Sequence, residues 1–142
     1  MKYVYPAIFH PEKEGGFSIF FPDIEGCYTQ GDTMVEAVEM AEDALNLMLW
    51  DKEENKEPIP HPSMPQDIRL EDPSDCIVWV SADTFKYRKM HDTKSVKKTL
   101  SIPRWLDTLA TDNNINFSNV LQHALKKQLL SLIHISETTR PY

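Results

Sequence analysis

The acidic side chains beside the predicted strands are the first residues in this sequence that could do chemistry. A metal-dependent nuclease needs several converging carboxylates that hold a divalent cation and activate water. Only Asp23 follows a predicted strand in a turn, and only Asp75 precedes another. Ser63, Ser81 and Ser118 belong to no nucleophile motif. We therefore expect no catalytic residues and predict that the chain is not an enzyme.

Histidines and cysteines are the other side chains that could hold a metal. The five histidines, at positions 10, 61, 91, 123 and 134, have no ligand-like spacing with one another or with either cysteine. Cys27 and Cys76 form no CxxC pair, so we expect both to be small buried side chains of a cytoplasmic protein. The sequence thus predicts neither a metal site nor a cofactor. A metal-sensing repressor is left as an alternative, which stoichiometric metal retention would reveal.

The first half of the chain has the pattern of a small sheet. Residues 2–10 and 17–21 are rich in aromatic and β-branched side chains, and a Gly-Gly turn signal separates them. A third strand is expected near residues 27–30. After a stiff, proline-rich connector at residues 55–66, the apolar run at residues 76–80 predicts a buried strand.

One helix is expected to cover this sheet. Thr33 and Glu36 fit a capping box, and the helix should end near residues 52–55, before Pro58. Its inward face is predicted to comprise Met34, Val38, Ala41, Leu45, Met48 and Leu49. The first domain, residues 1–83, is therefore βββ-α-linker-β, which makes the fold class α+β.

The charge of the chain changes sign along its length. The total is −7, but residues 1–92 hold 8 Lys and Arg against 19 Asp and Glu, a net charge of −11. Residues 93–142 carry +4. Such a split indicates two halves with different partners. Residues 84–95 are polar and basic and are predicted to be a partly helical linker between them. No apolar run approaches the roughly 20 residues of a membrane helix, so no membrane partner is expected.

The second half carries a strand followed by two helices, residues 96–130. The strand ends near Pro103, which fits the first turn of a helix, and Asn116 is a plausible cap for the second helix. About 35 residues of this kind cannot bury their own apolar faces, so the module should dimerise. The tail, residues 131–142, shows no cap or periodicity. We assign it no function and interpret it as a cloning-derived extension or a ragged terminus.

Residues 96–130 resemble the ribbon-helix-helix repressor family, in which two chains pair their strands into a ribbon that enters the DNA major groove. The resemblance implies that Lys97, Thr99 and Ser101 face the bases and that the backbone amides of residues 116–118 hold a phosphate. The DNA-binding residues implied at the second-helix start are Asn116, Phe117 and Ser118. The dimer core implied is Leu100, Ile102, Leu106, Leu121 and Leu125.

Two positions depart from the ribbon-helix-helix pattern. Asn114 stands where the family prefers glycine, which asparagine can imitate because it tolerates the left-handed conformation. Lys98 occupies an alternate strand position that is often apolar, which weakens the register at the start of the strand. A simpler interpretation treats Lys97 and Lys98 as solvated edge-strand charges that deter aggregation.

Longer stretches of the chain resemble the HicB antitoxins. The runs that carry this resemblance are residues 15–23, 26–33, 36–37, 87–89 and 94–99. It implies a partial RNase H-like first domain that binds and blocks a HicA toxin, a small mRNA-cleaving ribonuclease, and a second domain that represses its own promoter. Asp23, Glu25 and Tyr28 are the candidate toxin contacts. A homodimer, and a heterotetramer with the toxin, are expected.

One further hypothesis comes from another functional class. The chain could be a stand-alone ribbon-helix-helix repressor whose first domain binds a small ligand. A small basic protein encoded next to this chain would favour the antitoxin.

Overall fold

The computed structural model describes residues 1–139, with side chains through Leu132. The chain forms two compact units, one of residues 1–95 and one that begins at Val96. None of the described helices is long and apolar enough to cross a membrane.

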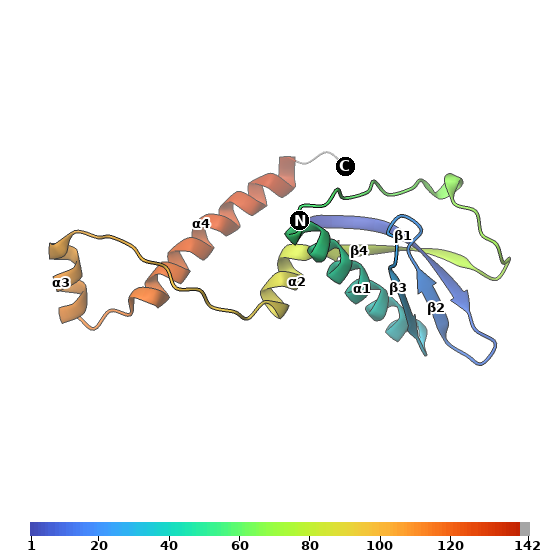
Figure 1. Ribbon diagram of the computed structural model, residues 1–142, viewed down its shortest axis with the longest axis horizontal. Helices are drawn as coiled ribbons and strands as arrows, with labels where there is room; N and C mark the ends of the chain where they lie inside the picture. The colour runs from blue at the N-terminus through green and yellow to red at the C-terminus, as the bar shows by residue number, and fades with distance from the viewer. Residues whose placement is uncertain (140–142) are drawn as a thin grey trace. The chain divides into compact units, whose positions relative to one another are not determined.

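A four-stranded antiparallel sheet forms the centre of the first unit (Figure 1). Its strands are β1 (Lys2–Pro11), β2 (Phe17–Phe20), β3 (Tyr28–Gly31) and β4 (Cys76–Asp83), in the order β3-β2-β1-β4. Three consecutive strands lie side by side as a meander, in agreement with the three successive strands predicted at the start of the chain. β4 returns from far along the chain and pairs with nearly all of β1, from Lys2 opposite Asp83 to Phe9 opposite Cys76.

The position of β4 at the edge of the sheet corrects two expectations. The sequence predicts a buried strand and two buried cysteines, yet Trp79 is 45% exposed and Cys76 is exposed. Only one face of this strand packs against the core, so Val80 is buried while its neighbour Trp79 points the other way. Cys27 is buried as expected, and this burial raises the pKa of its thiol to about 11.

Helix α1 (Met34–Glu54) covers one face of the sheet (Figure 1). It begins at the predicted cap, because the Thr33 hydroxyl accepts a hydrogen bond from the Glu36 amide at 3.1 Å. Its buried residues recur every fourth position and are Ala37, Ala41, Leu45 and Leu49. They share one core with strand residues that include Tyr5, Phe9 and Ile19. The α+β class with one covering helix is confirmed.

Gly31, the last residue of β3, lets α1 approach the sheet closely. A Cβ atom at Gly31 would lie 2.5 Å from the Ala37 nitrogen and 2.6 Å from the Ala37 Cα. Both are backbone atoms, so neither can rotate out of the way. Ala37 is the first buried residue of the helix. Met34, which precedes it, is 45% exposed instead of facing inward as predicted.

The polar segment after β4 forms helix α2 (Thr84–His91). Asp83 caps it by accepting from the Lys86 amide at 3.1 Å. The sequence predicts a partly helical linker over residues 84–95, whereas α2 belongs to the first unit and the division between the units falls after Ser95. The proline-rich connector carries one short 3-10 helix, η1 (Pro65–Asp67).

The second unit contains helices α3 (Arg104–Asp112) and α4 (Phe117–Thr139) (Figure 1). Between them Asn114 has a φ of 55°, the left-handed conformation predicted for this position. The Asn116 side chain accepts from the Asn119 amide at 3.1 Å, so it caps α4 as predicted. Helix α4 runs to Thr139 without a proline or glycine to stop it, so it includes most of the residues given above as the tail. Residues 140–142 of the predicted tail lie outside the described residues.

The predicted strand at residues 96–102 pairs with no strand in the part of the chain that the structure describes. A strand is defined by ladder hydrogen bonds to a neighbour. The prediction supplies that neighbour from a second copy, so a single chain leaves the segment extended between α2 and α3.

Candidate functional site

The second unit exposes the apolar face that should pair two chains. Among its described side chains none is buried; only Ala110 and Leu121 are even intermediate. A groove of about 680 Å³ runs between the extended segment and both helices. Its apolar lining is Leu100, Ile102, Leu106, Ala110, Ile115, Phe117, Val120, Leu121 and Ala124.

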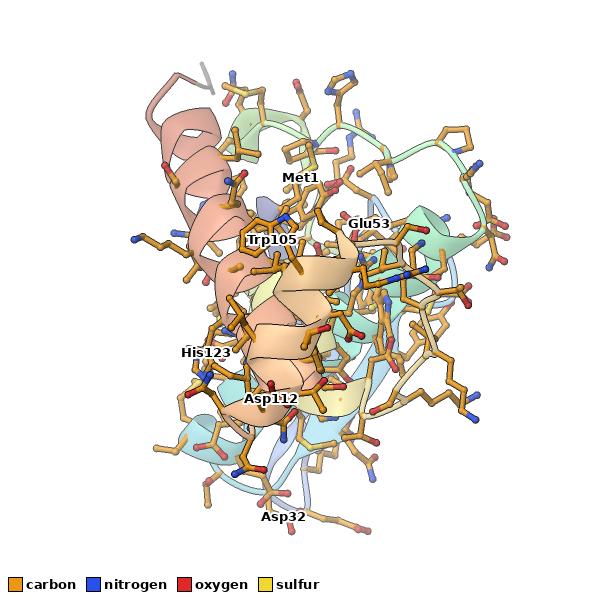
Figure 2. The ribbon with its side chains drawn as sticks, turned by 90° about the vertical axis from the view of Figure 1, so that its left-hand side faces the viewer. Met1, Asp32, Glu53, Trp105, Asp112 and His123 are labelled. Carbon is orange, nitrogen blue, oxygen red and sulfur yellow. The ribbon has the colours of Figure 1, made fainter. Side chains whose placement is uncertain are left out.

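Four of the five predicted dimer-core residues line this groove, namely Leu100, Ile102, Leu106 and Leu121. The fifth, Leu125, stands one turn beyond Leu121 on α4 and is 51% exposed. The structure also places Trp105 on α3 with 65% of its surface exposed (Figure 2). So much open apolar surface on about 40 residues is typical of an interface rather than of a free surface.

The extended segment separates its side chains into two sets. Lys98, Leu100 and Ile102 line the groove. The intervening residues Lys97, Thr99 and Ser101 are exposed and do not line it, which is the alternation of a strand. The three side chains assigned to base contacts therefore share a polar side of the segment.

The start of α4 presents backbone donors. The amides of Phe117 and Ser118 lie in the first turn, where no carbonyl inside the helix can accept from them. The Asn116 side chain accepts a hydrogen bond from the Asn119 amide, as described above. Phe117 and Ser118 also belong to the lining of the groove, and their amides suit a phosphate at this helix end.

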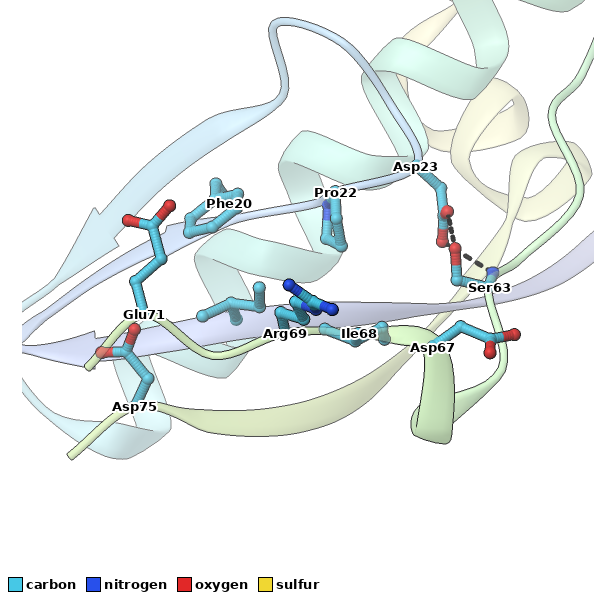
Figure 3. Close-up of a pocket in the computed structure, with 10 residues that line it drawn as sticks. Phe20, Pro22, Asp23, Ser63, Asp67, Ile68, Arg69, Glu71 and Asp75 are labelled. Atoms are coloured by element: carbon cyan, nitrogen blue, oxygen red, sulfur yellow. Dashed lines mark hydrogen bonds between the residues drawn. The ribbon is translucent and has the colours of Figure 1, made fainter. Parts of the chain in front are cut away.

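The candidate toxin contacts of the first unit differ in accessibility. Tyr28 is 74% exposed on β3, and Glu25 is exposed in the turn before it. The Asp23 carboxylate is instead engaged, because it accepts from the Ser63 amide at 2.9 Å and from the Ser63 hydroxyl (Figure 3). Asp23 therefore ties the connector to the turn after β2.

Sequence analysis missed the open apolar side chains on the sheet face opposite α1. Phe20 pairs in register with Tyr28 on β3 and with Ile8 on β1. Phe20 is 38% exposed, and Trp79 on β4 is 45% exposed. The signal was present, since each follows a core-facing residue by one position in a strand and must point to the other face.

Beside Phe20 lies a cavity of about 290 Å³ (Figure 3). Its lining is Ile8, Phe20, Pro22, Asp23, Ser63, Asp67, Ile68, Arg69, Glu71 and Asp75. Acids outnumber the single arginine, so the cavity disfavours an anionic ligand. Its volume is just below the range of ordinary small-molecule sites.

One group of side chains in the described part of the chain could hold a metal ion. The donor atoms of His10, Asp72 and Asp75 all lie within 4.8 Å of one another. Nitrogen and carboxylate oxygen suit a divalent transition metal. Sequence spacing does not indicate this group, because more than 60 residues separate the histidine from the acids.

The contacts inside this group describe an ion pair. His10 Nδ1 lies 2.5 Å from Asp75 Oδ1 and 3.9 Å from Asp72 Oδ2. The hydrogen bond to Asp75 raises the pKa of His10. Hydrogen bonds from the Ser74 hydroxyl and amide lower the pKa of Asp72. These bonds attach the end of the connector to β1.

Comparison with known proteins gives one family for most of the chain. Residues 5–125 match the model of the HicB-like antitoxins of bacterial toxin-antitoxin systems. The curated Antitoxin HicB 1 of Photorhabdus laumondii is 48% identical over 58 residues, which is 41% of this chain and 37% of that protein. The chain thus spans less than half the length of the first curated relatives it matches.

Two solved structures share the fold. A toxin-antitoxin complex from Streptococcus pneumoniae matches with a TM-score of 0.58 and 28% identity, covering 90% of this chain and 99% of that one. The antitoxin HicB of Burkholderia pseudomallei matches with a TM-score of 0.52 and 21% identity, covering 87% of this chain and 96% of that one.

Proposed function

Because the chain belongs to the HicB-like antitoxin family, we propose that it is the antitoxin of a HicBA-type toxin-antitoxin system. The observation that carries the proposal is the extent of the family match, residues 5–125, which reaches from β1 into α4 and so takes in both units. The chain would act by binding, with one unit for the toxin and the other for DNA. Both partners place this activity in the cytoplasm.

The first unit is proposed to bind and neutralise a small HicA-type ribonuclease that cleaves mRNA. An enzyme that holds RNA has a basic surface, and the net charge of −11 over residues 1–92 complements it and speeds association. Glu25 and Tyr28 are open to a partner, and Phe20 extends the apolar part of that surface next to Tyr28. Asp23 would contribute by fixing the connector beside them.

Co-expression tests this proposal. The chain, tagged, is expressed with the untagged small protein encoded beside it, and the neighbour should be retained and its RNA cleavage blocked at equimolar ratio. Tyr28→Ala with Glu25→Lys should weaken retention, whereas Glu14→Lys in the turn between β1 and β2 serves as a charge-matched control. A neighbour that is not retained, or that cleaves RNA equally well in the complex, would refute the antitoxin function.

The second unit is proposed to be a ribbon-helix-helix homodimer that binds operator DNA of its own promoter, with a heterotetramer formed when toxin is bound. What supports this is the absence of buried side chains in the described part of the unit together with the alternation along residues 97–102. Lys97, Thr99 and Ser101 would read base edges. The amides at residues 116–118 would hold a phosphate and set the register.

We further propose that the first unit is a partial RNase H-like domain without catalytic activity. Asp23, the acid in the turn after β2, is held by Ser63, and among the described residues it does not belong to the group of donor atoms that lie close enough together to hold a metal ion. Purified protein should leave RNA intact in the presence of Mg²⁺ or Mn²⁺. Metal-dependent cleavage that Asp23→Asn abolishes would contradict this assignment.

A stand-alone repressor with a ligand-binding first domain is the second candidate function. The cavity beside Phe20 favours it, because a small cationic or neutral ligand would fit about 290 Å³ lined by Asp67, Glu71 and Asp75. Such a ligand should shift operator affinity without any toxin present. The antitoxin function predicts instead that operator affinity responds to the toxin and not to small molecules.

A further inference from the structure

Helix α2 is attached to α1 by one of its faces. Arg88 Nη2 lies 3.0 Å from Glu54 Oε1 at the end of α1. One position earlier, the Tyr87 hydroxyl donates to Asp43 Oδ1 at 3.1 Å. These contacts neutralise Arg88 and decide which residues of α2 point away from the first unit.

The outward face of α2 carries two lysines. Lys86 and Lys89 are exposed and three positions apart, so their side chains are neighbours on the helix surface. Among the described residues neither forms an ion pair, and Lys89 Nζ lies 5.6 Å from the centre of the Phe85 ring. This pair of free cations lies in a part of the chain whose net charge is −11.

The chain continues from these lysines directly into the segment assigned to base contacts. Lys97 stands eight positions after Lys89, and eight extended residue steps span at most about 28 Å. One helical turn of DNA is about 34 Å long. A ribbon that places Lys97 in a major groove therefore keeps α2 within one turn of that groove, and a further lysine, Lys94, lies between them.

When an acidic unit on so short a segment approaches the duplex, only a cationic surface can face the phosphates without repulsion. Charges repel appreciably only within a Debye length, about 8 Å at physiological salt, so the element nearest to the DNA decides the sign of the interaction. Along the sequence, α2 is the last element of the first unit before the base-reading segment.

We propose that Lys86 and Lys89 contact the DNA phosphate backbone beside the ribbon, once in each protomer of the dimer. The inference rests on the proposed repressor function and deepens it. It adds a sequence-independent anchor from the first unit to the base contacts of the second. Each phosphate so neutralised releases counterions, which makes the contact visible in the salt dependence of binding.

The test compares two full-length double variants, each of which removes two positive charges from the first unit. Lys86→Gln/Lys89→Gln changes the proposed anchor. Lys13→Gln/Arg69→Gln is the control, because both are exposed and Lys13 follows the far end of β1, a strand of ten residues and so about 33 Å in length. Binding to a labelled fragment of the chain's own promoter and to a scrambled fragment is titrated between about 50 and 200 mM NaCl.

The anchor variant should lower the slope of log K against log salt by about 1.8 if one phosphate contact is lost per protomer, and by about 3.6 if two are lost. Both fragments should be affected equally, and the control should retain the wild-type slope. A slope that the anchor variant leaves unchanged, or that the control lowers by the same amount, overturns the inference. A loss confined to the promoter fragment also overturns it, because that result would indicate base reading. Wild-type protein that binds neither fragment refutes the repressor function, and with it this contact.

Discussion

Leu125→Ala measures how much the open apolar face contributes to dimerisation. Full burial of a leucine side chain stabilises by about 1.5–3 kcal/mol. Leu125 is 51% exposed in the single chain, so a dimer could bury about half of that, roughly 0.8–1.5 kcal/mol. A symmetric dimer contains the residue twice, and the loss becomes about 1.5–3 kcal/mol. The dimer dissociation constant should therefore rise by about 10- to 150-fold.

Sedimentation equilibrium over a concentration series measures this constant directly. Lys127→Ala is the matched control, because Lys127 is exposed on the same helix, stands two residues on and so points about 200° around it. It also leaves helix propensity nearly unchanged. A Leu125→Ala constant within twofold of both wild type and Lys127→Ala would refute the assignment of this face. Association would then run through the first unit.

Three other outcomes are expected. Gly31→Ala should lower the free energy of unfolding by about 1–3 kcal/mol, because the added Cβ would meet the backbone of α1. The melting temperature should fall by about 4–8 °C per kcal/mol. A melting curve that matches wild type would show that the helix can move away from the sheet without cost. Thr99→Ala should weaken operator binding by about 1–3 kcal/mol and relax the sequence preference at one base position per half-site. Lys98→Ala should leave the discrimination between operator sequences intact, as measured by operator titrations at one fixed salt concentration. The reverse pattern would shift the register of the strand by one residue. The pKa of His10 is raised by its hydrogen bond to Asp75. The stability that this bond confers is therefore complete below about pH 6.5, the ordinary pKa of histidine, and is lost as pH rises through the raised pKa. The urea midpoints of His10→Gln at pH 5.5 and 8.5 should lie closer together than those of wild type, and an unchanged difference would assign the pH dependence to other groups.

Features set by neighbouring residues could be predicted from the sequence. The Thr33 cap, the Asn116 cap and the left-handed Asn114 each depend on a few adjacent positions, and the structure has all three. The meander follows in the same way from its turns. Short apolar and charged patterns were therefore enough for the α+β class.

Features set by distant residues could not be predicted. Trp79 is exposed because it points to the sheet face opposite α1, and Cys76 is exposed at the first position of an edge strand; nothing within the apolar run itself indicates either position. The contact of His10 with Asp75 joins the end of β1 to the residue directly before β4, which lies 65 positions later in the chain. The polar, basic composition of residues 84–95 predicts a linker, whereas the packing of α2 depends on the contact of Arg88 with an acidic residue of α1.

In the proposed dimer, the lack of buried side chains in the described part of each second unit makes the folding of that unit depend on the expression level of the chain. A module that acquires its core only from a second copy has no fixed stability, because its folded fraction depends on how many chains the cell holds. At low copy number the number of dimers grows with the square of the number of chains. Occupancy of a promoter would then rise steeply past a threshold, and a doubling of expression would change repression by more than twofold.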